Sequence, residues 1–380
     1  MEKDIEIIDF DTENSVENKI ETPVLDMYGE DLTSKTYVTN PAIARDEEIK
    51  KLMVVVLTPD KSALLVGKAG IGKTAIVEGL AYLIQQDKVP NALKGYRIIK
   101  INSTSLLGKM TINGREEMTI SLLVEELKKI HKTILFIDEV HTLIGGDSDG
   151  PMDLANILKP ALDRGDIKAI GATTTEEYET YVIRDRAFLR RFDRIDVLEP
   201  SEETTVQILK GSLPRIEKKT GIKFKYSDYI TTLLIKSIVS ATSQYKRVYG
   251  LAAMYPDVAF SVLSQAFSLA LLEDKEEVSI LEVYNAIKTS KRIYPDVIVK
   301  ELDKFRVEYQ KFCEEENIVL PVVTINDIKT ISTTIVLFIT PHPINIFNII
   351  LCIFYENVNK HIDFIPVVYY YIYGGEYGII

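Results

Sequence analysis

Cysteine is scarce in this chain, and neither an excess of basic residues nor a signal peptide is present. The two cysteines among 380 residues, Cys313 and Cys352, lie far apart and form neither a disulfide framework nor a metal site. The net charge of -11 has the wrong sign for a protein whose main partner is nucleic acid. Because the N-terminus lacks a basic region followed by an apolar core, we expect a cytoplasmic protein.

Long apolar runs are also missing. The most apolar segments, Ile335–Ile339 and Ile344–Tyr355, are divided by Pro341 and Pro343, and neither reaches the ~20 residues that a membrane-spanning helix needs. Both belong to residues 321–380, an apolar tail rich in isoleucine and tyrosine with few charges. Two interpretations of this tail stay open: an interaction or membrane-surface segment, or an extension not shaped by the function of the main body. We expect that it does not join the folded core of the preceding residues.

Strand-like and helical patterns alternate between residues 38 and 200. The run Ile134–Ile137 is apolar at every position, as expected for a parallel strand buried on both faces. The alternation predicts an α/β fold, a parallel sheet covered by helices. The predicted strands are Ser62–Val66, Tyr96–Asn102, Thr133–Ile137, Lys168–Thr173 and Arg194–Leu198. The predicted helices lie near Thr74–Gln86, Glu116–His131, Met152–Arg164 and Thr175–Ile183.

The segments on either side of this region differ in character. Residues 1–37 are acidic and weakly patterned, which indicates a solvated lead-in. After residue 200, Ser201 and the two glutamates that follow form a helix N-cap signature. Helical patterns then run to about Glu316, so we predict a mostly helical second domain over residues 201–320. Its predicted helices are Glu202–Lys219, Ser227–Ala241, Pro256–Leu272, Ser279–Lys291 and Val297–Glu315.

The most informative motif is the glycine-rich stretch that ends in Lys73 and Thr74. It follows an apolar run and opens into a helical pattern, the context in which G-x-x-x-x-G-K-[ST] forms a P-loop. Backbone N–H groups in such a loop converge on phosphate oxygens, and the helix N-terminus adds its positive dipole. Lys73 is expected to reach the β- and γ-phosphates of ATP, and the Thr74 hydroxyl to bind Mg²⁺. The predicted ATP-binding loop comprises Gly67, Lys68, Ala69, Gly70, Ile71, Gly72, Lys73 and Thr74.

Two adjacent carboxylates, Asp138 and Glu139, follow the apolar run Ile134–Ile137. The C-terminal ends of strands in an open α/β sheet are where ligands gather. We therefore predict that Asp138 organises the Mg²⁺ ion and that Glu139 polarises the attacking water as general base. Neighbouring residues on a strand point in opposite directions, so two different roles are geometrically natural.

Together these motifs resemble the Clp-type AAA+ ATPases, in particular the first ATPase module of the ring-forming protein unfoldases and disaggregases. The resemblance extends from Asn40 to roughly Leu272. It implies an AAA+ sheet domain followed by a helical lid. The matching blocks, in order, are Asn40–Glu48, Gly67–Ala81, Val89–Gly95, Ile134–Leu143, Asn156–Gly165, Gly171–Tyr178 and Phe188–Phe192.

The resemblance also implies roles for single residues. Thr174 falls at the sensor position that orients the water near the γ-phosphate. Arg190 and Arg191 match the arginine-finger pair that reaches the nucleotide of the neighbouring subunit; a finger in trans raises the rate roughly 10³–10⁵-fold in GTPases. Ile43 and Ala44 lie where the family's backbone meets adenine, although Ala44 replaces the usual glycine. Without the surrounding matching blocks, Arg190 and Arg191 would indicate only a solvated basic face of a helix.

Three departures from the family pattern affect the expected mechanism. Thr111 and Ile112 stand where the pore loop normally carries a lysine followed by an aromatic residue that grips the polypeptide. In the second domain, Val258 replaces a lysine and Ala253 an arginine of the lid. These changes put strong threading and lid sensing in doubt. His141 also matches a family position, where we expect packing or capping and no chemistry.

The sequence therefore predicts a single-module Clp-type AAA+ ATPase that forms a homo-oligomeric ring, a hexamer, and remodels or unfolds protein substrates. From the sequence alone we expect no folded N-terminal substrate domain, no coiled-coil insertion in the lid, no second ATPase module and no loop for docking a protease ring. Two alternatives stay open. One is an AAA+ switch acting on nucleic acid, which the acidic charge opposes. The other is a regulatory ATP-binding subunit. The Ile112 and Val258 changes favour it, whereas Asp138, Glu139 and the arginine pair oppose it.

Overall fold

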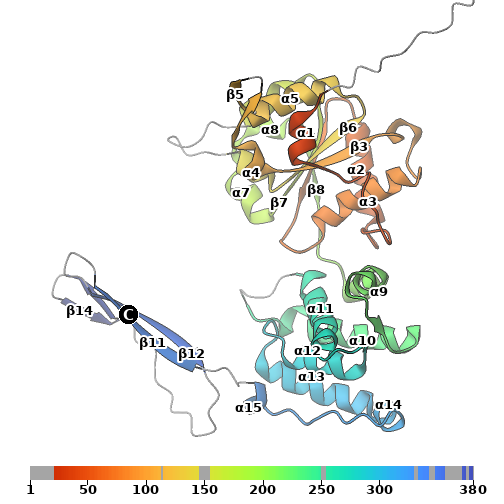
Figure 1. The fold of residues 1–380 in the computed structure, drawn as a ribbon, viewed down its shortest axis with the longest axis vertical. Helices are drawn as coiled ribbons and strands as arrows, with labels where there is room; N and C mark the ends of the chain where they lie inside the picture. Colours follow the sequence, from red (N-terminus) through yellow and green to blue (C-terminus); the bar gives the residue numbers. More distant parts are fainter. Residues whose placement is uncertain are drawn as a thin grey trace, which may run out of the picture. The chain divides into compact units, whose positions relative to one another are not determined.

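A computed structural model describes residues 21–112, 114–144, 155–249 and 254–328. Further along it describes the backbone of strands β11 (Thr333–Pro341), β12 (Phe347–Tyr355), β13 (Tyr370–Tyr373) and β14 (Glu376–Ile379). The chain divides into two compact units, Met1–Glu199 and Pro200–Ile380. Figure 1 shows the sheet and helices of the first unit and the helices of the second.

A six-stranded sheet forms the centre of the first unit, in the order β1-β3-β6-β7-β2-β8. All neighbours are parallel except β1 and β3, so the predicted parallel α/β sheet is confirmed. Every residue of β2 is buried, as are the first five of β6, because helices cover both faces. The strands are β1 (Gly29–Asp31), β2 (Ser62–Val66), β3 (Arg97–Asn102), β6 (Thr133–Asp138), β7 (Lys168–Thr173) and β8 (Phe192–Asp196).

Eight helices accompany this sheet in the described residues of the first unit. A short antiparallel hairpin, β4 (Lys109–Ile112) and β5 (Arg115–Met118), precedes α5, so the helix predicted from Glu116 begins three residues later. Strand β8 begins two residues before the prediction. The helices are α1 (Pro23–Tyr28), α2 (Asp46–Leu57), α3 (Lys73–Gln85), α4 (Ser103–Leu106), α5 (Thr119–Lys129), α6 (Ala155–Asp163), α7 (Thr175–Thr180) and α8 (Arg186–Leu189), with 3-10 turns at Asn91–Leu93, Val140–Leu143 and Val182–Arg184.

The solvated lead-in predicted for residues 1–37 is wrong for its second half. Val24 is fully buried in the core of the first unit, and Leu32 is almost fully buried. Glu126 on α5 accepts hydrogen bonds from the backbone N–H of Val24 at 2.8 Å and of Leu25 at 3.0 Å. Strand β1 adds an antiparallel edge to β3. The lead-in therefore belongs to the fold from residue 23 onward, while residues 1–20 lie outside the described part of the chain.

The second unit is helical over its described residues 200–249 and 254–328, apart from a two-residue parallel pair, β9 (Lys223–Phe224) with β10 (Glu277–Val278). Ser201 caps the first helix, since its side chain accepts the backbone N–H of Thr204 at 3.1 Å. The helix predicted over Val297–Glu315 is interrupted at Tyr309. The helices are α9 (Glu202–Thr220), α10 (Asp228–Ala241), α11 (Asp257–Leu272), α12 (Ile280–Lys288), α13 (Pro295–Glu308), α14 (Gln310–Glu315) and α15 (Ile325–Ile328), with a 3-10 turn at Gln244–Lys246.

The beginning of the predicted tail packs with this unit, which corrects the boundary drawn after residue 320. Val323 is only 2 % exposed and lies in the helical core. The Tyr284 hydroxyl donates to the carbonyl oxygen of Pro321 at 2.6 Å. Helix α15 contacts α13. The folded unit thus extends to Ile328.

Beyond it, β11 pairs with β12 and β13 with β14, each pair antiparallel. Within the described residues, no helix is long and apolar enough to cross a membrane.

Candidate nucleotide-binding site

The P-loop connects the buried strand β2 to helix α3. Gly70 and Gly72 adopt left-handed φ values of 76° and 99°, which glycine accepts without strain. Gly67 is required for space, because a Cβ there would lie 2.4 Å from the carbonyl oxygen of Val197. These glycines let the loop turn tightly onto the first turn of α3, where backbone N–H groups are free of helical partners.

The Lys73 ammonium lies over this loop. Its Nζ donates to the carbonyl oxygens of Gly67 at 2.7 Å and Lys68 at 3.1 Å. Burial lowers the pKa of Lys73 below its usual value, although the carboxylates of Asp138 and Glu177 act in the opposite direction. A phosphate in the loop would offer this ammonium stronger, charged acceptors than the two carbonyls.

Asp138, the last residue of β6, contacts side chains of helix α3 and strand β3. Its Oδ2 accepts the Thr74 hydroxyl at 3.0 Å and lies 3.5 Å from Nζ of Lys100 on the neighbouring strand β3. Its Oδ1 accepts the backbone N–H of Glu139 at 3.2 Å. Glu139 has a left-handed φ of 54° and an exposed side chain, so its carboxylate is accessible to solvent.

The C-terminal end of β7 supplies the opposite wall. Thr174 caps α7 through a capping box: its hydroxyl accepts the Glu177 N–H at 3.2 Å, and Glu177 Oε2 accepts the Thr174 N–H at 3.0 Å. The same Oε2 accepts the Thr173 hydroxyl and lies 3.0 Å from Nδ1 of His141. Burial opposes ionisation of Glu177, but the hydrogen bonds from Thr174 and the proximity of His141 bring its pKa below the usual value. His141 thus contacts Glu177, a residue that lines the cavity.

These groups surround one cavity of about 350 Å³. It brings together the predicted Lys73, Thr74, Asp138, Glu139 and Thr174. Its lining does not include Ile43, Ala44, Gly67, Lys68, Ile71, Arg190 or Arg191. The lining residues are Ala69, Gly70, Gly72, Lys73, Thr74, Asp138, Glu139, Ala172, Thr173, Thr174 and Glu177.

The segment with Ile43 and Ala44 is tied to the P-loop by a residue that the sequence reasoning missed. Arg45 is 6 % exposed, and its guanidinium donates to the carbonyl oxygens of Ile71 at 2.8 Å and Leu198 at 3.2 Å. It also pairs with Glu48 at 2.7 Å. Ala44 has a φ of 54°, a conformation that favours the glycine it replaces. The sequence around Arg45 gives no signal of its two carbonyl partners at Ile71 and Leu198, which are distant in sequence.

The two arginines of the predicted finger lie at the end of α8. Arg190 is exposed, and Arg191 forms an ion pair with Asp163 at the end of α6. Neither arginine lines the cavity formed by the P-loop and Asp138.

The residues that depart from the family pattern lie on a hairpin of the first unit and in the helical unit. The pore-loop residues lie on the hairpin β4–β5, which turns at Gly114 with a φ of 78°. The Ile112 side chain and Ala253 lie outside the described residues. Val258 is fully buried in the helical core, so its apolar side chain serves packing.

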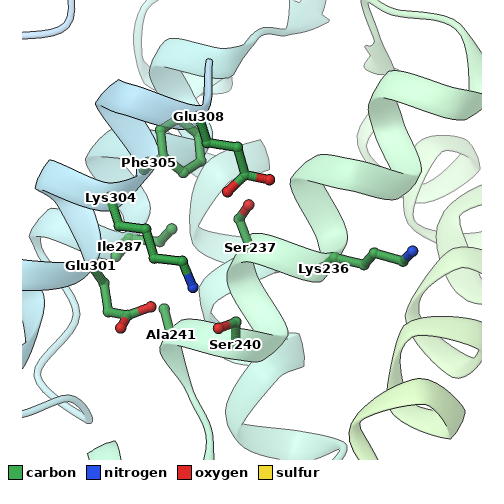
Figure 2. A pocket seen from close by; sticks show the side chains of 9 residues that line it. All are labelled: Lys236, Ser237, Ser240, Ala241, Ile287, Glu301, Lys304, Phe305 and Glu308. Atoms are coloured by element: carbon green, nitrogen blue, oxygen red, sulfur yellow. The ribbon is translucent and has the colours of Figure 1, made fainter. Parts of the chain in front are cut away.

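A second cavity, of about 140 Å³, lies within the helical unit (Figure 2). Figure 2 shows its lining on helices α10, α12 and α13, with Glu301 and Lys304 facing Ser240. Glu301 also pairs with Lys246 at 2.9 Å. The lining contains two lysines and two glutamates, so it has no excess of either charge to select an ionic ligand. The lining residues are Lys236, Ser237, Ser240, Ala241, Ile287, Glu301, Lys304, Phe305 and Glu308.

Comparison with known proteins identifies the first unit. Residues 63–199 match the ATPase family associated with various cellular activities (AAA). The first unit carries an AAA ATPase module. That match spans the P-loop, Asp138, Glu139 and Thr174, so nucleotide binding by this module follows from both the geometry and the family.

The chain is similar to Clp-type members of that family, as the motifs predicted. It is 36% identical over 295 residues to the chaperone protein ClpB of Helicobacter hepaticus, covering 74% of this chain and 33% of the relative. It is 42% identical over 229 residues to ClpB of Aquifex aeolicus, covering 60% and 22%. A Staphylococcus saprophyticus ClpC, an ATP-binding subunit of Clp protease, is 38% identical over 256 residues, covering 66% and 30%. The chain spans about a third or less of each.

Solved structures of Hsp104 are similar as well. A closed state of Hsp104 with ATPγS and FITC casein gives a TM-score of 0.61 at 30% identity, covering 81% of this chain and 51% of that chain. The S. cerevisiae Hsp104:casein complex in an extended conformation gives 0.57 at 33% identity, covering 68% and 43%. This ATPase module thus shares both sequence and fold with the Clp and Hsp104 group.

Proposed function

We propose that the chain hydrolyses ATP within a homo-oligomeric ring and uses the energy to remodel or unfold protein substrates. The observation that carries this proposal is the cavity of the first unit, where Lys73 and Thr74 of one segment meet Asp138 and Glu139 of another. In the proposed mechanism, Lys73 binds the β- and γ-phosphates, and Glu139 takes the proton of the attacking water. Thr174, on the opposite wall, orients that water.

Mg²⁺ suits the donors present. The Thr74 hydroxyl and the Asp138 carboxylate lie 3.0 Å apart, and oxygen ligands are what Mg²⁺ prefers. Thr74 donates its proton to Asp138 and so keeps its lone pairs for the ion. Bound with ATP, Mg²⁺ would neutralise charge that develops on the phosphates. The side chain of the proposed base Glu139 is exposed, which leaves its carboxylate available for water.

We assign Arg190 and Arg191 to the nucleotide of a neighbouring subunit. Their absence from the lining of their own cavity supports this assignment, and a finger in trans makes hydrolysis dependent on assembly. Of the two, Arg190 is exposed, and the contacts described include no ion pair of its side chain. Arg191, by contrast, forms an ion pair with Asp163. The hexamer is the ring size we propose, as the resemblance to the Clp-type AAA+ ATPases implies.

Protein is the proposed substrate class. The relatives include chaperones named ClpB, and the similar Hsp104 structures contain casein. The acidic charge opposes the alternative of a switch acting on nucleic acid. A regulatory subunit with little mechanical activity is the other alternative, favoured by Ile112 at the pore-loop position. We propose the cytoplasm as the compartment, since the two widely separated cysteines suit a reducing environment.

ATPase rate measured against protein concentration tests this proposal. We expect the specific rate to rise with concentration as rings assemble, and to increase further with an unfolded polypeptide such as casein. Stimulation by DNA instead would favour the nucleic-acid switch. A concentration-dependent rate that neither ligand stimulates would favour the regulatory subunit, and full activity as a monomer would contradict a shared site.

A further inference from the structure

Lys100 stands beside the carboxylate to which we assign the magnesium ion. It lies on β3, next to β6, and its Nζ is 3.5 Å from Oδ2 of Asp138 and 5.8 Å from the ring centre of Phe136. The side chains of Lys100 and Asp138 are each about 30 % exposed, at 29% and 30%. Glu30 of β1 lies opposite Lys100 in the strand register, but the Glu30 carboxylate forms an ion pair with Lys35 at 3.0 Å. Asp138 is thus the carboxylate that Lys100 faces.

The two oxygens of Asp138 are already engaged. Oδ2 accepts the Thr74 hydroxyl and faces the Lys100 ammonium, while Oδ1 accepts the Glu139 N–H. A divalent cation bound to this carboxylate would lie within several ångströms of a fixed positive charge. Like charges at that separation repel, even where water screens them partly.

We propose that Lys100 is a positioning residue that sets the magnesium requirement of the site. Without metal, its ammonium holds Asp138 toward Thr74 and balances the charge of the carboxylate. With metal, the same ammonium competes with the cation, so that Mg²⁺ binds more weakly than it would beside an uncharged residue. This inference rests on the proposed role of Asp138 in organising Mg²⁺.

Substitution of Lys100 by methionine tests the inference, because it removes the charge and keeps an unbranched side chain. The measurement is the affinity for a fluorescent ADP analogue, in EDTA and over a titration of Mg²⁺. We expect Lys100→Met to lower the half-saturating Mg²⁺ concentration about 3- to 10-fold, as a unit charge some 6 Å from a divalent ion in a wet environment implies. Lys100→Arg should stay within about 2-fold of the wild type because the charge is kept. Lys88→Met, at an exposed lysine of the same unit, controls for net charge.

The controls separate this inference from the proposed function. Asp138→Asn should remove most of the Mg²⁺ dependence of binding; if it does not, the assigned role of Asp138 is wrong. If Asp138→Asn behaves as expected but Lys100→Met leaves the half-saturating Mg²⁺ concentration unchanged or raises it, the competition is refuted. A loss of nucleotide affinity in EDTA for Lys100→Met would also refute it, since Lys100 would then contact the nucleotide directly.

Discussion

Arg45 offers the sharpest test of how the first unit holds its P-loop. The change is Arg45→Gln, which removes a buried guanidinium whose hydrogen bonds join three segments: the P-loop at Ile71, the end of the unit at Leu198, and helix α2 at Glu48. Glutamine is too short to replace all three contacts. Lys51→Gln is the matched control, because Lys51 is exposed on the same helix.

The magnitude follows from what the substitution leaves behind. The Ile71 carbonyl lies in a residue that is 2 % exposed, so the loss of its donor costs about 1–3 kcal/mol. The Leu198 carbonyl belongs to an exposed residue and can turn to water. Glu48 keeps a side-chain exposure of 18% and rehydrates in part, so the loss of its partner adds on the order of 1 kcal/mol. We expect the substitution to lower the free energy of unfolding by a total of about 3 kcal/mol.

Thermal unfolding is the assay. For a unit of this size about 3 kcal/mol corresponds to a decrease in Tm of roughly 6–12 °C. The transition of the first unit is recognised as the one that added nucleotide shifts upward. Lys51→Gln should move it by less than about 2 °C. If Arg45→Gln melts as the control does, the guanidinium contributes nothing to the stability of the unit and the reasoning fails.

Three further predictions concern hydrolysis and the folded limits of the chain. Lys73→Ala should weaken ATP binding, whereas Glu139→Gln should keep ATP bound and nearly abolish hydrolysis; wild-type turnover of Glu139→Gln in a phosphate-release assay would remove Glu139 as the base. Arg190→Ala should bind ATP normally yet hydrolyse it slowly, and mixing it with the Lys73→Ala protein should restore some turnover; no recovery in mixed rings would argue against action in trans. Truncation after Ile328 should preserve the melting temperature and ATPase activity, whereas truncation after Leu320 removes buried Val323 and should destabilise the helical unit by about 2 kcal/mol; equal melting of both would show that residues 321–328 do not stabilise the unit.

The sequence alone determined the elements whose signals are local. The P-loop is a contiguous stretch between an apolar run and a helical pattern, and Asp138 with Glu139 directly follows another apolar run. Because the C-terminal ends of parallel strands share one edge of the sheet, these two motifs were expected to meet, and in the structure they do so at the Thr74–Asp138 hydrogen bond. The alternation of patterns was likewise sufficient to predict the parallel sheet.

Tertiary structure decided the contacts between residues that are far apart in the chain. The acidic lead-in looks solvated by composition, yet Glu126, about a hundred residues away, accepts two backbone N–H groups of α1. Burial raises the pKa of this carboxyl group, although those hydrogen bonds favour its charged form.

Arg45 and Lys100 are ordinary basic residues in sequence. Their contacts form only in the folded unit, where Ile71 and Leu198 lie beside Arg45 and Asp138 lies beside Lys100. Hydrophobic periodicity records which face of an element is buried, but it does not record which element covers that face. These long-range pairings are therefore fixed by the packing of the whole unit.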